Sequence, residues 1–85
     1  MNISISLEPK AEKIKVTGRD LIVYFADGRK LEVPLIWFPK LLKASPRQKA
    51  KYRLIGGGIG IHWPEINEDL SVGGLLGAHL RSPLP

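Results

Sequence analysis

The stretch DLIVYFADGRKLEVPL, residues 20–35, decides the fold because two apolar runs lie on either side of a turn sequence. Residues 21–25 are leucine, β-branched or aromatic, as is typical of half-buried strands. From Leu31 to Leu35, apolar residues alternate with polar residues or proline. Glycine accepts the positive φ that a tight turn needs, so Asp27-Gly28 between the two runs predicts a β-hairpin.

The segment before this hairpin extends the sheet. Ile14 and Val16 alternate with lysines, and the next residues, TGRD at 17–20, are typical of a turn. The first half of the chain is therefore expected to form a three-stranded antiparallel meander. Apolar residues also alternate between positions 3 and 7, where we expect a short edge strand or an irregular start.

Two short helices are expected after the meander. Pro39 suits the first turn of a helix over Lys40 to Ala44, because an N–H is not needed there. The sequence SPRQ at 45–48 has the pattern of a capping box, with serine as N-cap and glutamine at the third helical position. A second helix is therefore predicted over residues 46–51.

The stretch IGGGIGIHWPEINEDLSVGGLL, residues 55–76, predicts a second hairpin and a last helix. Apolar residues flank a glycine cluster, and Pro64 ends the second strand because it has no N–H to donate. Asn67 or Asp69 is the expected N-cap of a helix from about Leu70 to Ala78.

The chain is thus expected to be a small α+β protein with one domain over residues 1–78 and a flexible tail over 79–85. The domain comprises an antiparallel β-meander followed by two short helices, a second β-hairpin and a C-terminal helix. The length of 85 residues suffices for one modest core, and the charged share of 25% is that of an ordinary globular domain.

The composition excludes several classes of protein. The chain has no cysteine, which excludes disulfides, thiolate metal ligands and cysteine nucleophiles. The start of the chain lacks the pattern of a signal peptide, and no apolar run is long enough to cross a membrane. We therefore expect a cytoplasmic protein that has no contact with membranes.

The net charge of +5 is concentrated in one segment. Residues 40–64 hold six basic side chains and no acid, whereas residues 65–85 hold three acids and one arginine. One hypothesis is therefore a nucleic-acid-binding accessory protein that uses segment 40–53. No recognition-helix pattern or pair of stacking aromatics accompanies the segment, so it also fits a solvated face. Its cations are Lys40, Lys43, Arg47, Lys49, Lys51 and Arg53.

The glycines in the 55–76 stretch do not form a phosphate-binding loop. Gly56, Gly58 and Gly60 follow a predicted strand, but a P-loop needs a Lys-Ser/Thr pair and a helix directly after its glycines. The Trp63-Pro64 pair that follows here is incompatible with that helix start. The glycines therefore favour a tight turn, and we expect no bound cofactor.

His62 is the centre of two further hypotheses, a metal site and a hydrolytic site. His62 with Glu65, Glu68 and Asp69 offers nitrogen and oxygen ligands, but the spacing matches no standard metal motif. A Ser-His-Asp set can be drawn with Ser45 or Ser71, yet there is no nucleophile elbow.

We therefore assign no catalytic and no metal-binding residue and expect a protein that is not an enzyme; a small metal-dependent or hydrolytic protein centred on His62 stays an alternative. Alternation along a strand places His62 opposite Ile61 and Trp63. We expect Trp63 in the core and His62 partly exposed.

Three segments of the chain resemble a family of small bacterial proteins, domain-of-unknown-function family 2442. They are FADGR, VPLIWFPKLLKAS and GIHWPEINEDLSVGGLL, and the resemblance spans about residues 10–77. Asn67 stands where this family usually has aspartate. The resemblance implies an α+β fold. It also implies an antitoxin-like role, because members are often encoded beside another small uncharacterised protein. The family has no established catalytic residues to carry over.

The leading hypothesis is a non-catalytic protein-interaction module whose partner is a small protein, with a toxin-like protein as one candidate. Aromatic residues beside short polar side chains suit the core of an interface. The oligomeric state is left open. The residues expected to bind the partner are His62, Trp63, Pro64, Glu68 and Asp69.

Overall fold

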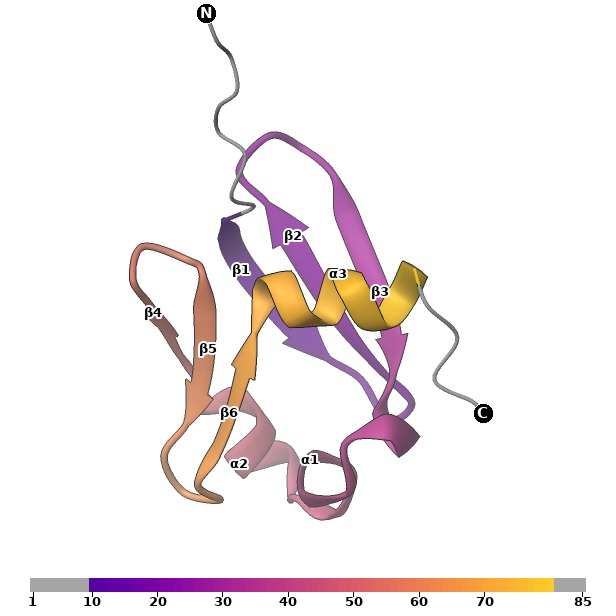
Figure 1. Cartoon of the computed structure of the whole chain (residues 1–85). Helices are drawn as coiled ribbons and strands as arrows, with labels where there is room; N and C mark the ends of the chain where they lie inside the picture. Colours follow the sequence, from indigo (N-terminus) through magenta and orange to yellow (C-terminus); the bar gives the residue numbers. More distant parts are fainter. Residues whose placement is uncertain (1–9, 81–85) are drawn as a thin grey trace, which may run out of the picture.

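Two three-stranded antiparallel sheets and three short α-helices make up residues 10–80, the part of the chain that the computed structural model describes (Figure 1). The first sheet has the order β1-β2-β3 and confirms the predicted meander. Its two hairpins pair each strand with the next one in the chain. The strands of this first sheet are β1 (Ala11–Val16), β2 (Asp20–Phe25) and β3 (Lys30–Pro34).

The turn between β2 and β3 has the conformation that Asp27-Gly28 predicts. Gly28 has a φ of 97°, in the left-handed region that glycine tolerates. The Asp27 side chain accepts a hydrogen bond from the backbone N–H of Arg29 at 3.1 Å and from its Nε at 2.9 Å. The backbone hydrogen bond and the guanidinium of Arg29 lower the pKa of Asp27 below its ordinary value. Local chemistry therefore determines this turn.

Three short helical segments follow the first sheet: η1 (Leu35–Trp37), α1 (Pro39–Lys43) and α2 (Pro46–Ala50). The predicted helices over 40–44 and 46–51 are confirmed to within one residue. The capping box is also confirmed, because the Ser45 hydroxyl accepts from the backbone N–H of Gln48 and the Gln48 side chain accepts from the backbone N–H of Ser45.

The second sheet has three strands, where only a hairpin was predicted. Its strands are β4 (Arg53–Ile55), β5 (Gly60–Trp63) and β6 (Glu68–Ser71), in that order. The prediction of a helix capped by Asn67 or Asp69 was wrong. Pairing with β5 places Leu70 beside Ile61, and Asn67 instead adopts a φ of 53° in the β5–β6 turn. Asparagine tolerates this left-handed conformation better than most residues.

The last helix, α3 (Val72–Leu80), begins two residues later than predicted. Its N-cap is Ser71, whose hydroxyl accepts a hydrogen bond from the N–H of Gly74 at 2.7 Å. The helix includes the first two residues of the predicted tail, while the rest of that tail and the segment 3–7 lie outside the described residues. No helix in the described range is long and apolar enough to span a membrane.

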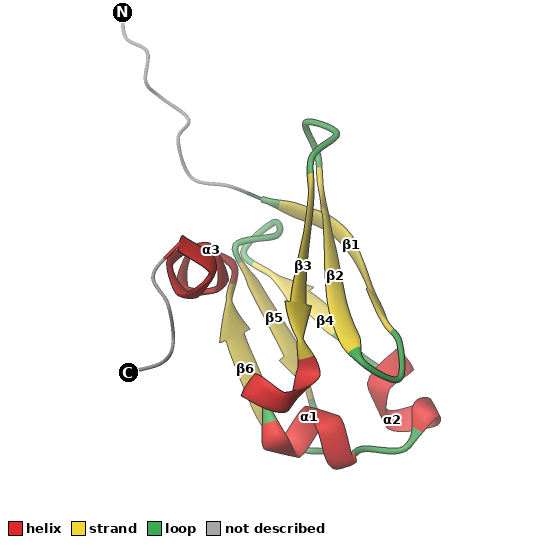
Figure 2. Cartoon of the chain, turned by 90° about the vertical axis from the view of Figure 1, so that its right-hand side faces the viewer, coloured by secondary structure: helices red, strands yellow, loops and turns green. Residues whose placement is uncertain are grey.

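The core lies where the two sheets and α3 meet. The helix α3 runs across one face of the first sheet, and α1 and α2 lie together at one end of the domain (Figures 1 and 2). Trp63 is fully buried and its indole N–H donates to the backbone carbonyl of Lys49 at 3.1 Å. The largest fully buried side chains come from several elements: Leu21, Val23, Val33, Leu35, Leu41, Ile61, Trp63 and Val72.

A close backbone contact joins the two sheets. The N–H of Ala11, at the start of β1, donates to the carbonyl of Gly58 at 2.7 Å. Gly58 is buried with a φ of 112°, and a Cβ at this position would lie 2.3 Å from the carbonyl oxygen of Ala11. The β4–β5 turn therefore needs glycine at position 58 both for its φ and for the approach of β1.

Candidate functional site

One face of the second sheet is open to solvent, and it carries four of the polar residues that the sequence singles out: Arg53, His62, Asp69 and Ser71. Along β5, the buried residues Ile61 and Trp63 alternate with residues that point to the other side. We call this other side the outer face. The strand register aligns its six positions in two rows, Arg53–His62–Asp69 and Ile55–Gly60–Ser71.

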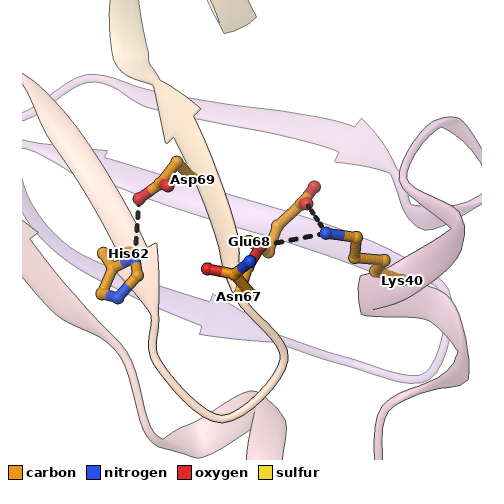
Figure 3. Close-up of polar contacts among 5 residues, drawn as sticks. All are labelled: Lys40, His62, Asn67, Glu68 and Asp69. Atoms are coloured by element: carbon orange, nitrogen blue, oxygen red, sulfur yellow. Dashed lines mark hydrogen bonds and ion pairs between the residues drawn. The ribbon is translucent and has the colours of Figure 1, made fainter.

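His62 and Asp69 form a hydrogen-bonded pair on the outer face. The two residues are direct neighbours in the β5–β6 ladder, and His62 Nδ1 lies 2.6 Å from Asp69 Oδ1 (Figure 3). The His62 side chain is 20% exposed and that of Asp69 is 68% exposed. In a neutral ring, this contact places the proton on Nδ1 and leaves Nε2 as a free acceptor. The pair thus presents one oriented imidazole edge at the surface.

Glu68 lies on the opposite side of β6, toward the helices. Its Oε1 is 3.8 Å from Nζ of Lys40, and the same ammonium donates to the carbonyl of Asn67 at 2.9 Å (Figure 3). Lys40 lies in the first turn of α1. These contacts hold the β5–β6 turn against α1, so Glu68 has a structural environment different from that of Asp69.

The five residues predicted to bind a partner therefore do not form one surface. His62 and Asp69 lie together on the outer face, and Pro64 is exposed in the turn after β5. Trp63 is fully buried, as its alternation with His62 predicts, and it supports the surface only from beneath. Glu68 points to the other side of the sheet. This arrangement follows from the pleat of β5 and β6, which sends consecutive side chains to opposite faces.

Two exposed isoleucines on this side of the molecule were missed by sequence reasoning. Ile55 is 46% exposed and Ile59 is 38% exposed. They border a shallow, mainly apolar hollow of about 400 Å³ that Gly60, Asp69 and Ser71 also line. The absence of a side chain at Gly60 helps to open this hollow. The sequence could have indicated the exposure of Ile55, because Ile55 follows Arg53 by two residues. Alternation along a strand places both on the face opposite Leu54.

The six cations of segment 40–53 do not act as one free basic surface. Lys40 is engaged by Glu68 and Asn67, and Lys51 Nζ lies 3.1 Å from Oε2 of Glu65. Arg53 belongs to the outer face. The acidic patch that follows the basic segment in sequence thus neutralises part of it in space. The other cations of the segment, Lys43, Arg47 and Lys49, lie on α1 and α2.

The hypotheses of a metal site and of a hydrolytic site gain no support from the described residues. No three His, Asp or Glu side chains within this part of the chain are placed to hold a metal ion together. Both serines considered as nucleophiles are helix caps, since Ser45 caps α2 and Ser71 caps α3.

Fold and site together define a class: a small α+β domain of two three-stranded antiparallel sheets, one of them with an open face that carries a His–Asp pair. The family model described as "Protein of unknown function (DUF2442)" matches residues 11–79, and the chain belongs to this family. The match confirms the resemblance seen in the sequence.

A crystal structure supports the same fold. The chain is similar to a protein of unknown function from Rhodospirillum rubrum ATCC 11170, with 30% sequence identity and a TM-score of 0.73. The alignment covers 84% of this chain and 88% of the other one. No curated protein matches the chain.

Proposed function

We propose that the chain is a cytoplasmic, non-catalytic protein-interaction module that binds a small partner protein through its outer face. The observation that carries this proposal is the pair of exposed isoleucines, Ile55 and Ile59, beside the hydrogen-bonded pair of His62 and Asp69. An antiparallel sheet that faces only water on one side normally presents polar residues there. The exposed apolar hollow departs from that pattern.

The composition of the outer face resembles that of a small interface. Interfaces combine an apolar centre with a polar rim and are enriched in arginine. Here the hollow around Gly60 supplies the apolar centre, and the row Arg53–His62–Asp69 supplies the rim. A partner that covers the hollow removes both isoleucines from water, which is favourable by about 25 cal/mol per Å² of apolar surface.

The rim is ordered before the partner binds. Asp69 holds the imidazole of His62, and the fully buried Trp63 lies next in the strand and anchors β5 in the core. A side chain that is already held loses less conformational entropy on association. This arrangement supports binding and does not require chemistry at His62.

The proposed partner is a small protein encoded next to this one, with this chain as the antitoxin-like member of the pair. This part of the proposal rests on the family, whose members are often encoded beside another small uncharacterised protein. A small protein is favoured over nucleic acid as the partner, because Lys40 and Lys51, two of the six cations of segment 40–53, are already paired with acidic residues.

The test is affinity purification of the tagged chain from its native cells at moderate salt, with a nuclease-treated control. We expect one stoichiometric small protein that is lost with Ile55→Asp and retained with Ile36→Asp. Ile36 is a matched control because it is 71% exposed and lies in η1, away from the second sheet. Equal loss with both variants, or partners that disappear after nuclease treatment, would contradict the proposal.

A further inference from the structure

A second hollow lies on the first sheet, between the end of β1 and α2. Its volume is about 380 Å³, and its surface is mainly apolar. Ile14 and Val16 of β1 form one wall, and Pro46, Ala50 and Tyr52 form the other. None of these residues belongs to the outer face of the second sheet. The hollow is therefore a separate feature of the molecule.

The backbone of β1 is an open sheet edge along this hollow. The strand pairs with β2 on one side only. On the other side, the N–H of Ala11 donates to Gly58 and the N–H of Ile14 donates to the hydroxyl of Tyr52 at 3.3 Å. A β-bulge between Ala11 and Lys13 accounts for the three-residue interval between these two N–H groups; beyond the bulge, every second residue points its N–H and C=O to the same side. The carbonyl of Ile14 and both backbone groups of Val16 consequently face the hollow.

Within the described residues, no hydrogen bond to these three backbone groups is formed by another strand or side chain. The opposite edge of the sheet, β3, is different. It ends in Pro34, which has no N–H to offer an added strand. A proline at an edge therefore opposes the addition of another strand. The end of β1 is the edge that remains able to accept one.

The charges at this site indicate which side chains the added strand should carry. Lys15 and Lys49 line the hollow, and none of its lining residues is acidic. Along β1, Ile14 is buried while Lys13 and Lys15 are exposed. A strand added beside β1 directs alternate side chains to the same two faces. Its inward side chains meet the apolar hollow, and its outward side chains lie beside two ammonium groups.

We propose that the free edge of β1 binds an extended segment of a partner protein in which apolar and acidic residues alternate. The segment becomes a fourth strand of the first sheet. A second copy of β1 is a poor occupant, because its own Lys13 and Lys15 would lie near those of the first copy. The site is independent of the outer face and extends the proposed function to a second surface.

The test is a titration of the ¹⁵N-labelled full chain followed by NMR. The probe is a seven-residue peptide of alternating valine and glutamate, and the control peptide has lysine in place of glutamate. We expect amide shifts confined to residues 14–17 and 47–52 with the acidic peptide, together with slower hydrogen exchange at Val16. The basic peptide should leave these amides unchanged.

Two variants make the result specific. The first is the double variant Lys13→Glu and Lys15→Glu, whose substitutions are both on the exposed side of β1. The acidic peptide should bind this variant about tenfold more weakly, because two charge pairs are lost. The basic peptide should now bind instead. Ile55→Asp should bind the acidic peptide normally, so failure at the outer face and failure here are distinguishable.

Three results would each overturn the proposal. They are amide shifts around Ile55 and His62, no response at millimolar peptide, and an unchanged preference of the double variant for the acidic peptide. Dimerisation of the chain through β1, measured by light scattering, would also overturn it, since it identifies a second copy as the occupant.

Discussion

Glu68 and Asp69 are consecutive in the chain, but their carboxylates lie on opposite faces of β6. Asp69 holds the imidazole of His62 on the open face of the second sheet, whereas Glu68 faces the ammonium of Lys40 on the side of the helices. One short acidic run therefore has two separate roles. It orients a surface histidine, and it fastens a turn to α1.

The contact between His62 and Asp69 should determine the tautomer of the imidazole and contribute little to the free energy of unfolding. Asp69 is largely exposed, and such pairs contribute roughly 0.2–1 kcal/mol to the free energy of unfolding. Asp69→Ala should therefore lower the unfolding free energy by less than about 1 kcal/mol in urea titrations. Long-range ¹⁵N spectra of the neutral imidazole should show the proton mainly on Nδ1 in the original chain and a tautomer mixture in the variant.

Glu68→Gln is the control for this measurement, because Glu68 lies on the other face of the same strand. It should leave the tautomer of His62 unchanged. If Asp69→Ala and Glu68→Gln give the same ring signals as the original chain, the contact at 2.6 Å does not orient the histidine in solution.

Trp63→Phe should destabilise the fold strongly. The change removes the indole N–H that donates to the carbonyl of Lys49 and leaves space in the core around a fully buried ring. The loss of a buried hydrogen bond together with core volume predicts a decrease of about 2–4 kcal/mol in the unfolding free energy. Chemical denaturation followed by circular dichroism measures this value.

Trp37→Phe is the matched control, since Trp37 is half-buried and its indole makes no hydrogen bond within the described residues. A cost of about 1 kcal/mol is expected there, because little buried volume is lost. Equal costs for the two substitutions would show that the bond to Lys49 and the full burial of Trp63 contribute little.

Gly58→Ala should destabilise the fold far more than Gly57→Ala. Both glycines have positive φ, 112° and 73°, but only Gly58 approaches the backbone of Ala11. A methyl group at position 57 meets no atom within 4 Å, so about 1–2 kcal/mol of backbone strain is expected there. At position 58, β1 must also move away, and the cost should exceed about 3 kcal/mol. Thermal and urea unfolding of the two variants measures the difference.

The β2–β3 turn should weaken in acid. The pKa of Asp27 is lowered in the folded chain by its hydrogen bond from the backbone of Arg29 and by the nearby guanidinium. A depressed pKa stabilises the fold above the carboxyl's unfolded value, near 3.8, and this contribution is lost as pH falls through the lower folded value. Asp27→Asn, which cannot ionise, should thus be less stable than the original chain at pH 6.

Urea midpoints of the two proteins, measured from pH 6 down to pH 2.5, check this prediction. The difference between them should shrink as the pH falls below about 4, because Asp27 takes up a proton first in the unfolded chain and only at lower pH in the folded chain. A difference that stays constant over this range would exclude Asp27 ionisation as its source.

Several elements could be predicted because their signals are local. The Asp27-Gly28 turn needs only a residue that accepts positive φ, and the Ser45–Gln48 capping box is complete within four residues. The alternation of Ile61, His62 and Trp63 was likewise sufficient to place tryptophan in the core and histidine near the surface. In each case, the residues that determine the conformation are neighbours in the chain.

The strand β6 could not be predicted in this way. Its first residues, Glu68 and Asp69, are poor strand formers and resemble the acidic first turn of a helix. They form a strand because β5 offers an open edge, Asn67 accepts the left-handed turn, and Leu70 packs beside Ile61. The helix then starts only at Val72, with Ser71 as its cap.

The sequence by itself determined the meander, the two short helices, the buried tryptophan and membership of the family. Only the tertiary structure decided that β6 completes a second sheet, that Lys40 faces Glu68, and that His62 meets Asp69 beside Ile55. The physical reason is the range of the interactions. Turns and caps are satisfied by adjacent residues, whereas the choice between strand and helix at 68–71, and the face on which each charge lies, depends on partners brought together by folding.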